Sequence, residues 1–262
     1  MAGGWERQFA ELDRLSRPVN EWLCRSARLR PGMRVLDIAS GSGQPAFMAA
    51  GYVRPGGSVV ATDLSSEMVK ALRRRATRRG VDNLEAREAD MDELPFVDAS
   101  FDAVLCRWGY MFSSRQERAF AETHRVLHEN GMLATATWDG SAPVPLASLL
   151  NDLLNESEGK APRRLVVAEQ LDTEEKLRAV LEGAFFRDIQ IEQLSFHFDF
   201  ASPQAWWDFM LEMATPVRAR LDALDDGQLN ALRSRFEREA EKLRRGDRIM
   251  PPAVCLCAKA RK

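Results

Sequence analysis

Residues 33–50, MRVLDIASGSGQPAFMAA, decide the fold of this chain. Their first part is an apolar run without polar alternation, which predicts a parallel strand buried on both faces. The run breaks at Gly41 and Gly43, and the Ala-rich segment from Pro45 is typical of a helix with proline in its first turn. Strand, glycine turn and helix N-terminus form a cradle in which backbone N–H groups face a ligand and no Cβ blocks its approach. The stretch therefore predicts a site for a nucleotide-like cofactor.

Strands and helices continue to alternate as far as residue 138. Further strands are expected at 58–62, 84–88, 101–108 and 132–138, with helices at 65–79 and 116–128. Ser65 is the expected N-cap of the first of these helices. Because parallel strands need crossover connections, the pattern predicts an α/β fold with a doubly wound, Rossmann-like sheet.

The pattern changes on both sides of this region. Residues 1–30 show helical spacing of apolar residues with a break at Pro18, which predicts one or two amphipathic helices. Beyond residue 140 we expect helices at 143–158, at 173–181, after Ser202 and at 226–245, and strands at 189–200 and 253–258. The sheet is thus expected to be mostly parallel with an antiparallel last strand, plus a helical cap. We divide this single domain into N-terminal helices (1–32), a cofactor-binding core (33–140), a substrate cap with an edge strand (141–252) and the last strand (253–262).

Composition excludes several classes of function. A net charge of −2 and a pI near 6.0 give no reason to expect nucleic-acid binding. No apolar run approaches the roughly 18–20 residues that span a bilayer, and the first residues lack the apolar core of a signal peptide. We therefore expect a cytoplasmic protein without a membrane partner. The sequence leaves the oligomeric state open.

The cysteines and histidines do not predict a metal site. The four cysteines, Cys24, Cys106, Cys255 and Cys257, form no Cys-x-x-Cys pair, and no histidine-rich cluster accompanies them. We expect buried, reduced cysteines with a structural role.

The glycine turn alone does not identify the cofactor. It satisfies the dinucleotide pattern G-x-G-x-x-G/A, and Asp63, about twenty residues later, could bind a ribose hydroxyl in a nicotinamide enzyme or in a nucleoside-sulfonium enzyme.

Acidic residues favour a cationic ligand. Asp37, Asp63 and Asp90 end three successive strands, so they are expected at the carboxyl edge where open α/β sheets bind ligands. A carboxylate at Asp37 would repel a pyrophosphate but suits an ammonium or a sulfonium. The cradle is also expected to lack a Lys or Arg partner for phosphates.

Four motifs in order, VLDIASGSG, VVATDLSSEMV, AREADMDELPFVDASFDAVLCRWGYMF and ETHRVLHENGMLATATW, cover about residues 33–138. With them the sequence resembles the class I S-adenosylmethionine-dependent methyltransferases, in particular the branch similar to ubiquinone/menaquinone C-methyltransferases and small-molecule methyltransferases. The C-terminal half fits this family more loosely. The chain also departs from many relatives at Ser40, Gln44 and Pro45.

The resemblance implies roles for residues at this edge. Asp63 would accept the ribose hydroxyls, Asp90 the adenine amino hydrogen, and Arg107 would contact the methionine carboxylate or the substrate. The implied cofactor-binding residues are Asp37, Ala39, Gly41, Ser42, Gly43, Asp63, Leu64, Asp90, Met91 and Arg107.

Aromatic residues are the candidates for the substrate side. Trp108, Tyr110 and Met111 follow the fourth strand, where packing and substrate contact are both open. Trp206 and Trp207 begin a cap helix, and either roof an apolar substrate or pack inside the cap. We expect a pocket between the cap and the end of the fourth strand, bounded by Tyr110 and one of these tryptophans.

We assign no catalytic residue. Methyl transfer from a sulfonium is an in-line displacement that depends mainly on alignment, although a hydroxyl or carbon acceptor also needs a base. His124, His128 and His197 are expected in structural or surface positions. The predicted function is transfer of the methyl group of S-adenosylmethionine to a small, partly apolar molecule, onto oxygen, nitrogen or carbon. The alternatives are an NAD-dependent oxidoreductase and a non-methylating member of the same fold.

Overall fold

The computed structural model describes residues 2–142, 145–160, 171–213 and 215–262. Contacts divide the chain into two compact units. The sheet unit comprises Ser16–Gly140, Val167–Leu194 and Cys255–Lys262, and the helical unit comprises Met1–Leu15, Ser141–Val166 and Ser195–Val254.

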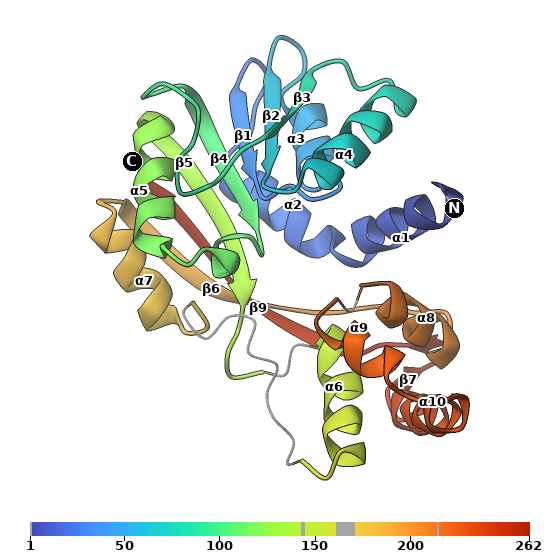
Figure 1. The fold of residues 1–262 in the computed structure, drawn as a ribbon. Helices are drawn as coiled ribbons and strands as arrows, with labels where there is room; N and C mark the ends of the chain where they lie inside the picture. Colours follow the sequence, from blue (N-terminus) through green and yellow to red (C-terminus); the bar gives the residue numbers. More distant parts are fainter. Residues whose placement is uncertain (1, 143–144, 161–170, 214) are drawn as a thin grey trace. The chain divides into compact units, whose positions relative to one another are not determined.

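The sheet unit is built on a seven-stranded sheet (Figure 1). Its strands are β1 (Arg34–Ile38), β2 (Ser58–Asp63), β3 (Leu84–Glu88), β4 (Phe101–Arg107), β5 (Leu127–Trp138), β6 (Arg187–His197) and β9 (Pro252–Arg261). They lie in the order β3-β2-β1-β4-β5-β9-β6. β1 to β5 pair in parallel, and β9 is antiparallel to β5. The predicted Rossmann-like sheet with an antiparallel last strand is confirmed.

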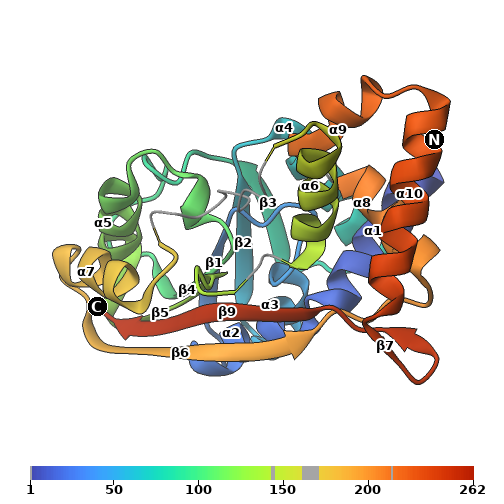
Figure 2. The same cartoon turned by 90° about the horizontal axis from the view of Figure 1, so that it is seen from below.

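Helices cover both faces of this sheet. They are α2 (Arg17–Ser26), α3 (Ala46–Tyr52), α4 (Ser66–Arg78), α5 (Gln116–Val126) and α7 (Glu174–Gly183), with a 3₁₀ turn η1 (Tyr110–Phe112). α2 and α3 pack on the central strands, whereas α5 lies beside α7 (Figures 1 and 2). β6 and β9 run side by side at the edge of the sheet (Figure 2).

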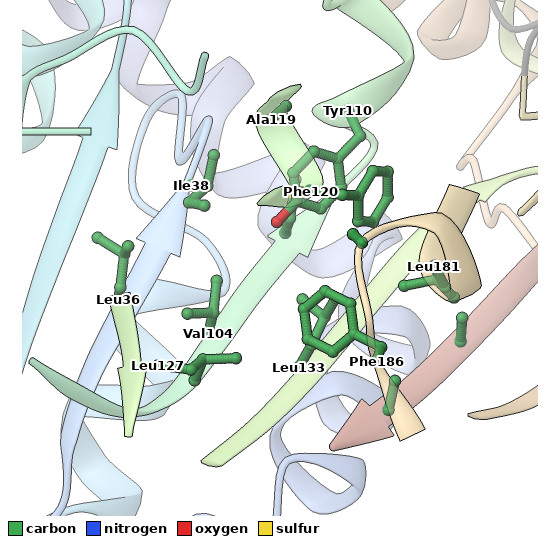
Figure 3. Close-up of a cluster of buried hydrophobic side chains, with 14 of the residues drawn as sticks. Leu36, Ile38, Val104, Tyr110, Ala119, Phe120, Leu127, Leu133, Leu181 and Phe186 are labelled. Atoms are coloured by element: carbon green, nitrogen blue, oxygen red, sulfur yellow. The ribbon is translucent and has the colours of Figure 1, made fainter. Parts of the chain in front are cut away.

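The main core explains why the apolar residues of the first strand do not alternate with polar ones. Leu36 and Ile38 of β1 are buried together with Val104 of β4, Phe120 of α5 and Leu181 of α7 (Figure 3). Burying one such side chain contributes about 1.5–3 kcal/mol, so this cluster fixes the central strands and the turns that follow them.

Side-chain caps set two helix starts where the sequence predicts them. Ser65 accepts a hydrogen bond from the Met68 amide at 3.4 Å, and Thr173 accepts one from the Lys176 amide at 3.2 Å. Each cap satisfies an amide that has no partner inside its helix.

The helical unit contains α1 (Ala2–Leu15), α6 (Pro145–Ser157), α8 (Pro203–Met213), α9 (Thr215–Asp222) and α10 (Asp226–Glu241), with a hairpin of β7 (Arg244–Arg245) and β8 (Arg248–Ile249). α6, α8 and α10 pack against one another (Figure 1). Residues 143 and 144, the expected start of α6, lie outside the described residues.

Several predicted boundaries were wrong for physical reasons. The break between the first two helices falls at Ser16, because Pro18 fits the first turn of α2, where its missing N–H is not needed. β5 begins at Leu127 instead of Met132, since a shifted register lets the strand continue past Gly131. α9 was not predicted.

The C-terminal boundaries also differ. α10 ends at Glu241, because Arg244 and Arg245 pair with β8 in a hairpin. The sixth strand ends at His197, and Phe200 forms only a single bridge with Ile249. Contacts place α7 and residues 187–194 with the sheet, and α1 with the cap helices. None of the described helices is both long and apolar enough to cross a bilayer.

Candidate functional site

The glycine turn between β1 and α3 has the open backbone that its sequence predicts. Gly41 has a φ of +53° and Gly43 one of +115°, and no atom lies within 4 Å of a Cβ built on Gly41. The turn is anchored where the Ser40 amide donates to the Thr62 carbonyl at 2.8 Å and the Gly43 amide to the Ser40 carbonyl at 2.9 Å. Ala39, with a φ of 54°, and the buried Ser42 complete this segment.

Asp37 is a buried acid with one hydrogen-bonded oxygen. Its Oδ2 accepts from the Ala46 amide at 3.0 Å, whereas its buried Oδ1 has no hydrogen-bond partner. Burial raises the pKa of this carboxyl to about 7, although the Ser40 hydroxyl and the positive charge of Arg107 both act to lower it. A buried carboxylate oxygen without a donor is costly, so the position favours a ligand that brings a donor or a positive charge.

Asp63 joins the end of β2 to the glycine turn. Its Oδ2 accepts from the Gly41 amide at 2.8 Å and its Oδ1 from the Ser65 amide at 2.9 Å. A carboxylate has about four acceptor sites, which leaves capacity for ligand hydroxyls. Leu64 beside it is 69% exposed and offers an apolar surface at the same edge.

The third acidic position follows β3. Asp90 is exposed, and its Oδ1 accepts from the Asp92 amide at 2.9 Å, which holds the loop in a tight turn. Met91 is half-buried against the main core. Because Asp63 of β2 pairs with Glu88 of β3, Asp90 lies on the same carboxyl edge as Asp37 and Asp63.

β4 ends at Arg107 beside the cradle, and Trp108 follows it directly. The Arg107 guanidinium lies 4.7 Å from the Trp108 ring centre. Trp108 stacks on Trp138 with ring centres 4.3 Å apart, and its Nε1 donates to the Sγ of Cys255 at 3.3 Å. Its half-buried ring is therefore held against β5 and β9.

The loop after Trp108 lies against the glycine turn, but its first aromatic ring points inward. A Cβ built on Gly109 would lie 2.6 Å from the Cβ of Ala39. Tyr110 is 2% exposed and stacks on Phe120 at 4.1 Å, with its hydroxyl 2.7 Å from the Thr123 hydroxyl (Figure 3). Burial raises the pKa of Tyr110 well above its usual value. This environment favours the packing alternative for Tyr110.

Met111 and Phe112 differ in exposure. Met111 is buried with 9% exposure, whereas Phe112, which the sequence analysis did not select, is 70% exposed. An exposed phenylalanine in the loop that touches the glycine turn is a stronger candidate for substrate contact than its two buried neighbours.

The two cap tryptophans are interior residues of the helical unit. Trp206 and Trp207 are 1% and 2% exposed, and their ring centres lie 4.9 Å and 5.3 Å from that of Phe236. Trp206 also stacks on Phe200 at 5.7 Å. This packing favours the second alternative, the interior of the cap, over contact with substrate.

Two charged residues near the site were not selected from the sequence. Asp139 directly follows β5 and is 4% exposed. Its Oδ2 accepts a hydrogen bond from the side-chain Nε2 of Gln193 at 2.6 Å. The strand-end pattern of the other acids could have found it. Arg75 of α4 donates to the Ser42 carbonyl, so an arginine does contact the cradle. This guanidinium binds the protein backbone, which agrees with a site that is not built for phosphates.

The cysteines and histidines among the described residues form neither a disulfide nor a cluster of metal ligands. The four cysteines are buried and unpaired, and burial raises the pKa of Cys106 to about 12. His124 packs on Phe186 at 5.2 Å, and burial lowers its pKa. His128 is exposed and His197 half-buried. No group of three or more His, Cys, Asp or Glu side chains among the described residues gathers as metal ligands do.

A separate hollow of about 320 Å³ opens at the opposite edge of the sheet, where β4 and β5 begin. Its lining mixes basic and acidic side chains, among them Arg28, Arg30, Asp102, Glu129 and Arg261. The balance of charges there does not favour one class of ligand.

The residues at the carboxyl edge fit S-adenosylmethionine. The open turn at Gly41 admits a ligand close to the backbone, and the unpartnered oxygen of Asp37 suits a positively charged group. Asp63 retains acceptor capacity for ribose hydroxyls.

Comparisons with known proteins agree with this site. A family model described as a methyltransferase domain matches residues 36–135. An arsenite methyltransferase of Halobacterium salinarum is 27% identical over 204 residues, 76% of this chain and 49% of that protein. The ubiquinone/menaquinone biosynthesis C-methyltransferase of Bordetella avium is 40% identical over 107 residues, 41% of each chain. A putative methyltransferase structure from Bacillus halodurans has a TM-score of 0.59 and 23% identity over 93% of this chain and 98% of that one.

The matched stretch spans less than half the length of these curated relatives. It contains the strands and turns that carry the glycine turn and the strand-end acids. Over residues 36–135 the chain therefore carries a methyltransferase domain and is similar to the class I S-adenosylmethionine-dependent methyltransferases, whose cofactor is S-adenosylmethionine.

Proposed function

We propose that the protein is an enzyme that transfers the methyl group of S-adenosylmethionine to a small, partly apolar molecule. The observation that carries the proposal is the half-satisfied buried Asp37 beside the open turn at Gly41. When bound there, S-adenosylmethionine supplies a methyl group on a positively charged sulfur. We also propose a cytoplasmic location, because four free cysteines suit a reducing compartment.

In this proposal the chain binds and orients the cofactor through its backbone and its acids. The turn at Gly41 and Gly43 receives the methionine part, and Asp37 lies beneath it as a negative charge. Asp63 accepts the ribose hydroxyls while it holds the turn through the Gly41 amide. Leu64 offers its exposed side chain to the adenine. Fixed orientation is the main requirement of an in-line displacement, so these contacts supply most of the catalytic effect.

The remaining cofactor contacts come from the neighbouring strands. Asp90 is proposed to accept from the adenine amino group, with Met91 beside the ring, and Arg107 to bind the methionine carboxylate. Arg107 is close enough to Asp37 to oppose the rise of its pKa, which supports a role at the same end of the site.

The substrate side of the proposal rests on the loop after β4. Phe112 exposes an aromatic ring in this loop, and Trp108 holds a half-buried ring beside it. An apolar surface of this kind suits a small molecule with an aromatic or aliphatic part. Two relatives are, by their names, an arsenite methyltransferase and a C-methyltransferase of ubiquinone/menaquinone biosynthesis, and these names also point to small molecules. The pocket between the cap and the end of β4 stays a prediction.

A panel assay tests the proposal. The protein is incubated with methyl-labelled S-adenosylmethionine and small phenols, quinones, amines and thiols, and the label on the acceptor and the demethylated cofactor are measured. We expect one class to receive label in step with cofactor demethylation. Binding of the cofactor without label transfer to any class would favour a non-methylating member of the fold, whereas reduction of NAD with a small alcohol would favour an oxidoreductase.

A further inference from the structure

Arg75 is an unusual residue for the middle of a surface helix. It belongs to the basic run of α4, yet its side chain is 6% exposed while Arg74 and Arg78 are exposed. Its Nη1 donates to the Ser42 carbonyl at 2.5 Å. Arginine is rarely buried without a specific partner, and here one partner is the backbone of the glycine turn.

An aromatic ring places this guanidinium. The Cζ of Arg75 lies 5.3 Å from the centre of the Phe47 ring, and that of Arg79 lies 4.6 Å from the same centre. The ring also occupies the space beside Gly43, where a built Cβ would approach Phe47 to 2.3 Å. Glycine turn, ring and guanidinium therefore fit together as one unit in which residue 43 has no room for a side chain.

The hydrogen bonds hold both sides of one peptide group. In the peptide between Ser42 and Gly43, the carbonyl accepts a hydrogen bond from Arg75. The N–H of the same peptide donates to the Ser40 carbonyl at 2.9 Å. Gly43, with a φ of +115°, has the backbone freedom that would otherwise let this peptide rotate. A rotated peptide would change which polar groups of the turn face the ligand.

We propose that Arg75 is a positioning residue for S-adenosylmethionine: it fixes the Ser42–Gly43 peptide so that the turn keeps the backbone orientation the cofactor needs. The proposal rests on the proposed function. Arg75 touches neither cofactor nor substrate in this account and acts only through the backbone of the turn.

The test compares Arg75→Met with a matched control on the same helix. Methionine keeps much of the apolar stem over Phe47 and removes the charged donor. Arg73→Met is the control, because Arg73 also donates to a backbone carbonyl, that of Ala86 in β3, at 2.8 Å and 3.1 Å. Both changes remove a charge-assisted bond between α4 and the backbone, but only one bond ends on the glycine turn.

Calorimetry with S-adenosylmethionine gives the first readout. Loss of a charge-assisted hydrogen bond predicts that Arg75→Met raises the Kd of the cofactor about tenfold. Arg73→Met should leave the Kd unchanged, and Arg75→Lys, which keeps one charged donor, should restore part of the affinity. The KM of the methyl acceptor, once known, should not change. Equal affinity in Arg75→Met and the wild type would overturn the proposal, as would an equal loss in both methionine variants.

Amide hydrogen exchange separates this proposal from the proposed function. The Gly43 amide should exchange faster in Arg75→Met than in Arg73→Met, whether or not a cofactor is present. If the wild type did not bind S-adenosylmethionine, the proposed function would fail, and the positioning role would fail with it. If the wild type bound the cofactor but Gly43 exchange were the same in both variants, only the role of Arg75 would be refuted. Should Arg75→Met not fold, Arg75→Lys gives the same comparison with a smaller expected effect.

Discussion

Replacing Asp37 by asparagine should stabilise the empty protein and weaken its cofactor binding. Asparagine has nearly the same shape, and its oxygen can still accept from the Ala46 amide. Its NH₂ group replaces the buried oxygen that has no donor. The variant therefore removes a buried negative charge with little change in packing.

The magnitude follows from the pKa of Asp37. Burial raises it from 3.8 to about 7 in the folded protein. The difference corresponds to roughly 4 kcal/mol at pH values above 7, an upper value for a group in this environment. The unfolded chain releases this proton near pH 3.8, whereas the folded protein holds it until about pH 7. Asp37 therefore lowers the free energy of unfolding as pH rises across this window, and its effect is constant above it.

Urea unfolding of both proteins at several pH values measures this effect. The free energy of unfolding of Asp37→Asn, minus that of the wild type, should grow between about pH 4 and pH 7 by up to roughly 4 kcal/mol and then level off. In calorimetry, S-adenosylmethionine should bind the wild type more tightly as pH rises toward 7, because a cation favours the ionised carboxylate. The variant should bind it more weakly and without this pH dependence. A stability difference that does not change with pH would refute the reasoning.

Three further predictions concern the ribose contact, the glycine turn and the cap interior. Asp63→Ala should raise the Kd of S-adenosylmethionine about tenfold to a hundredfold, since it removes charge-assisted hydrogen bonds to the ribose, and unchanged affinity in a folded variant would contradict the ribose assignment. Gly43→Ala should weaken cofactor binding because of its positive φ and its 2.3 Å approach to Phe47, while Gly51→Ala, in open space on α3, serves as the control with full binding. Trp206→Ala should lower the free energy of unfolding by about 3–5 kcal/mol, whereas Trp206→Phe should leave the KM of the acceptor unchanged; a raised KM in a stable Trp206→Phe would restore its role as a substrate contact.

Local sequence signals were sufficient for the sheet and for placing acidic residues at its carboxyl edge. An apolar run without polar alternation identified β1, because a strand covered on both faces has no polar side to alternate with. Asp63 could be placed from its position at the end of a strand, and the structure puts it against the Gly41 amide. Such features depend on a few neighbouring residues, which is why the sequence predicts them well.

Long-range packing was beyond these signals. Tyr110 follows a strand at the ligand edge, but only the three-dimensional packing of Phe120 and Thr123 reveals that its ring points into the core. For Trp206 and Trp207, the sequence pattern of a helix that contacts substrate is the same as that of a helix that packs inside the cap. Only the contacts of both rings with Phe236 distinguish the two. Arg75 belongs to a run of arginines, and nothing in α4 itself indicates that one of them reaches the turn 33 residues earlier.

The central claim is tested most directly by calorimetric titration of the wild-type protein with S-adenosylmethionine, its demethylated product and NAD. The acidic edge formed by Asp37 and Asp63, with the open turn at Gly41, predicts saturable binding of the first two and none of NAD. Binding of NAD without any response to S-adenosylmethionine would contradict the account.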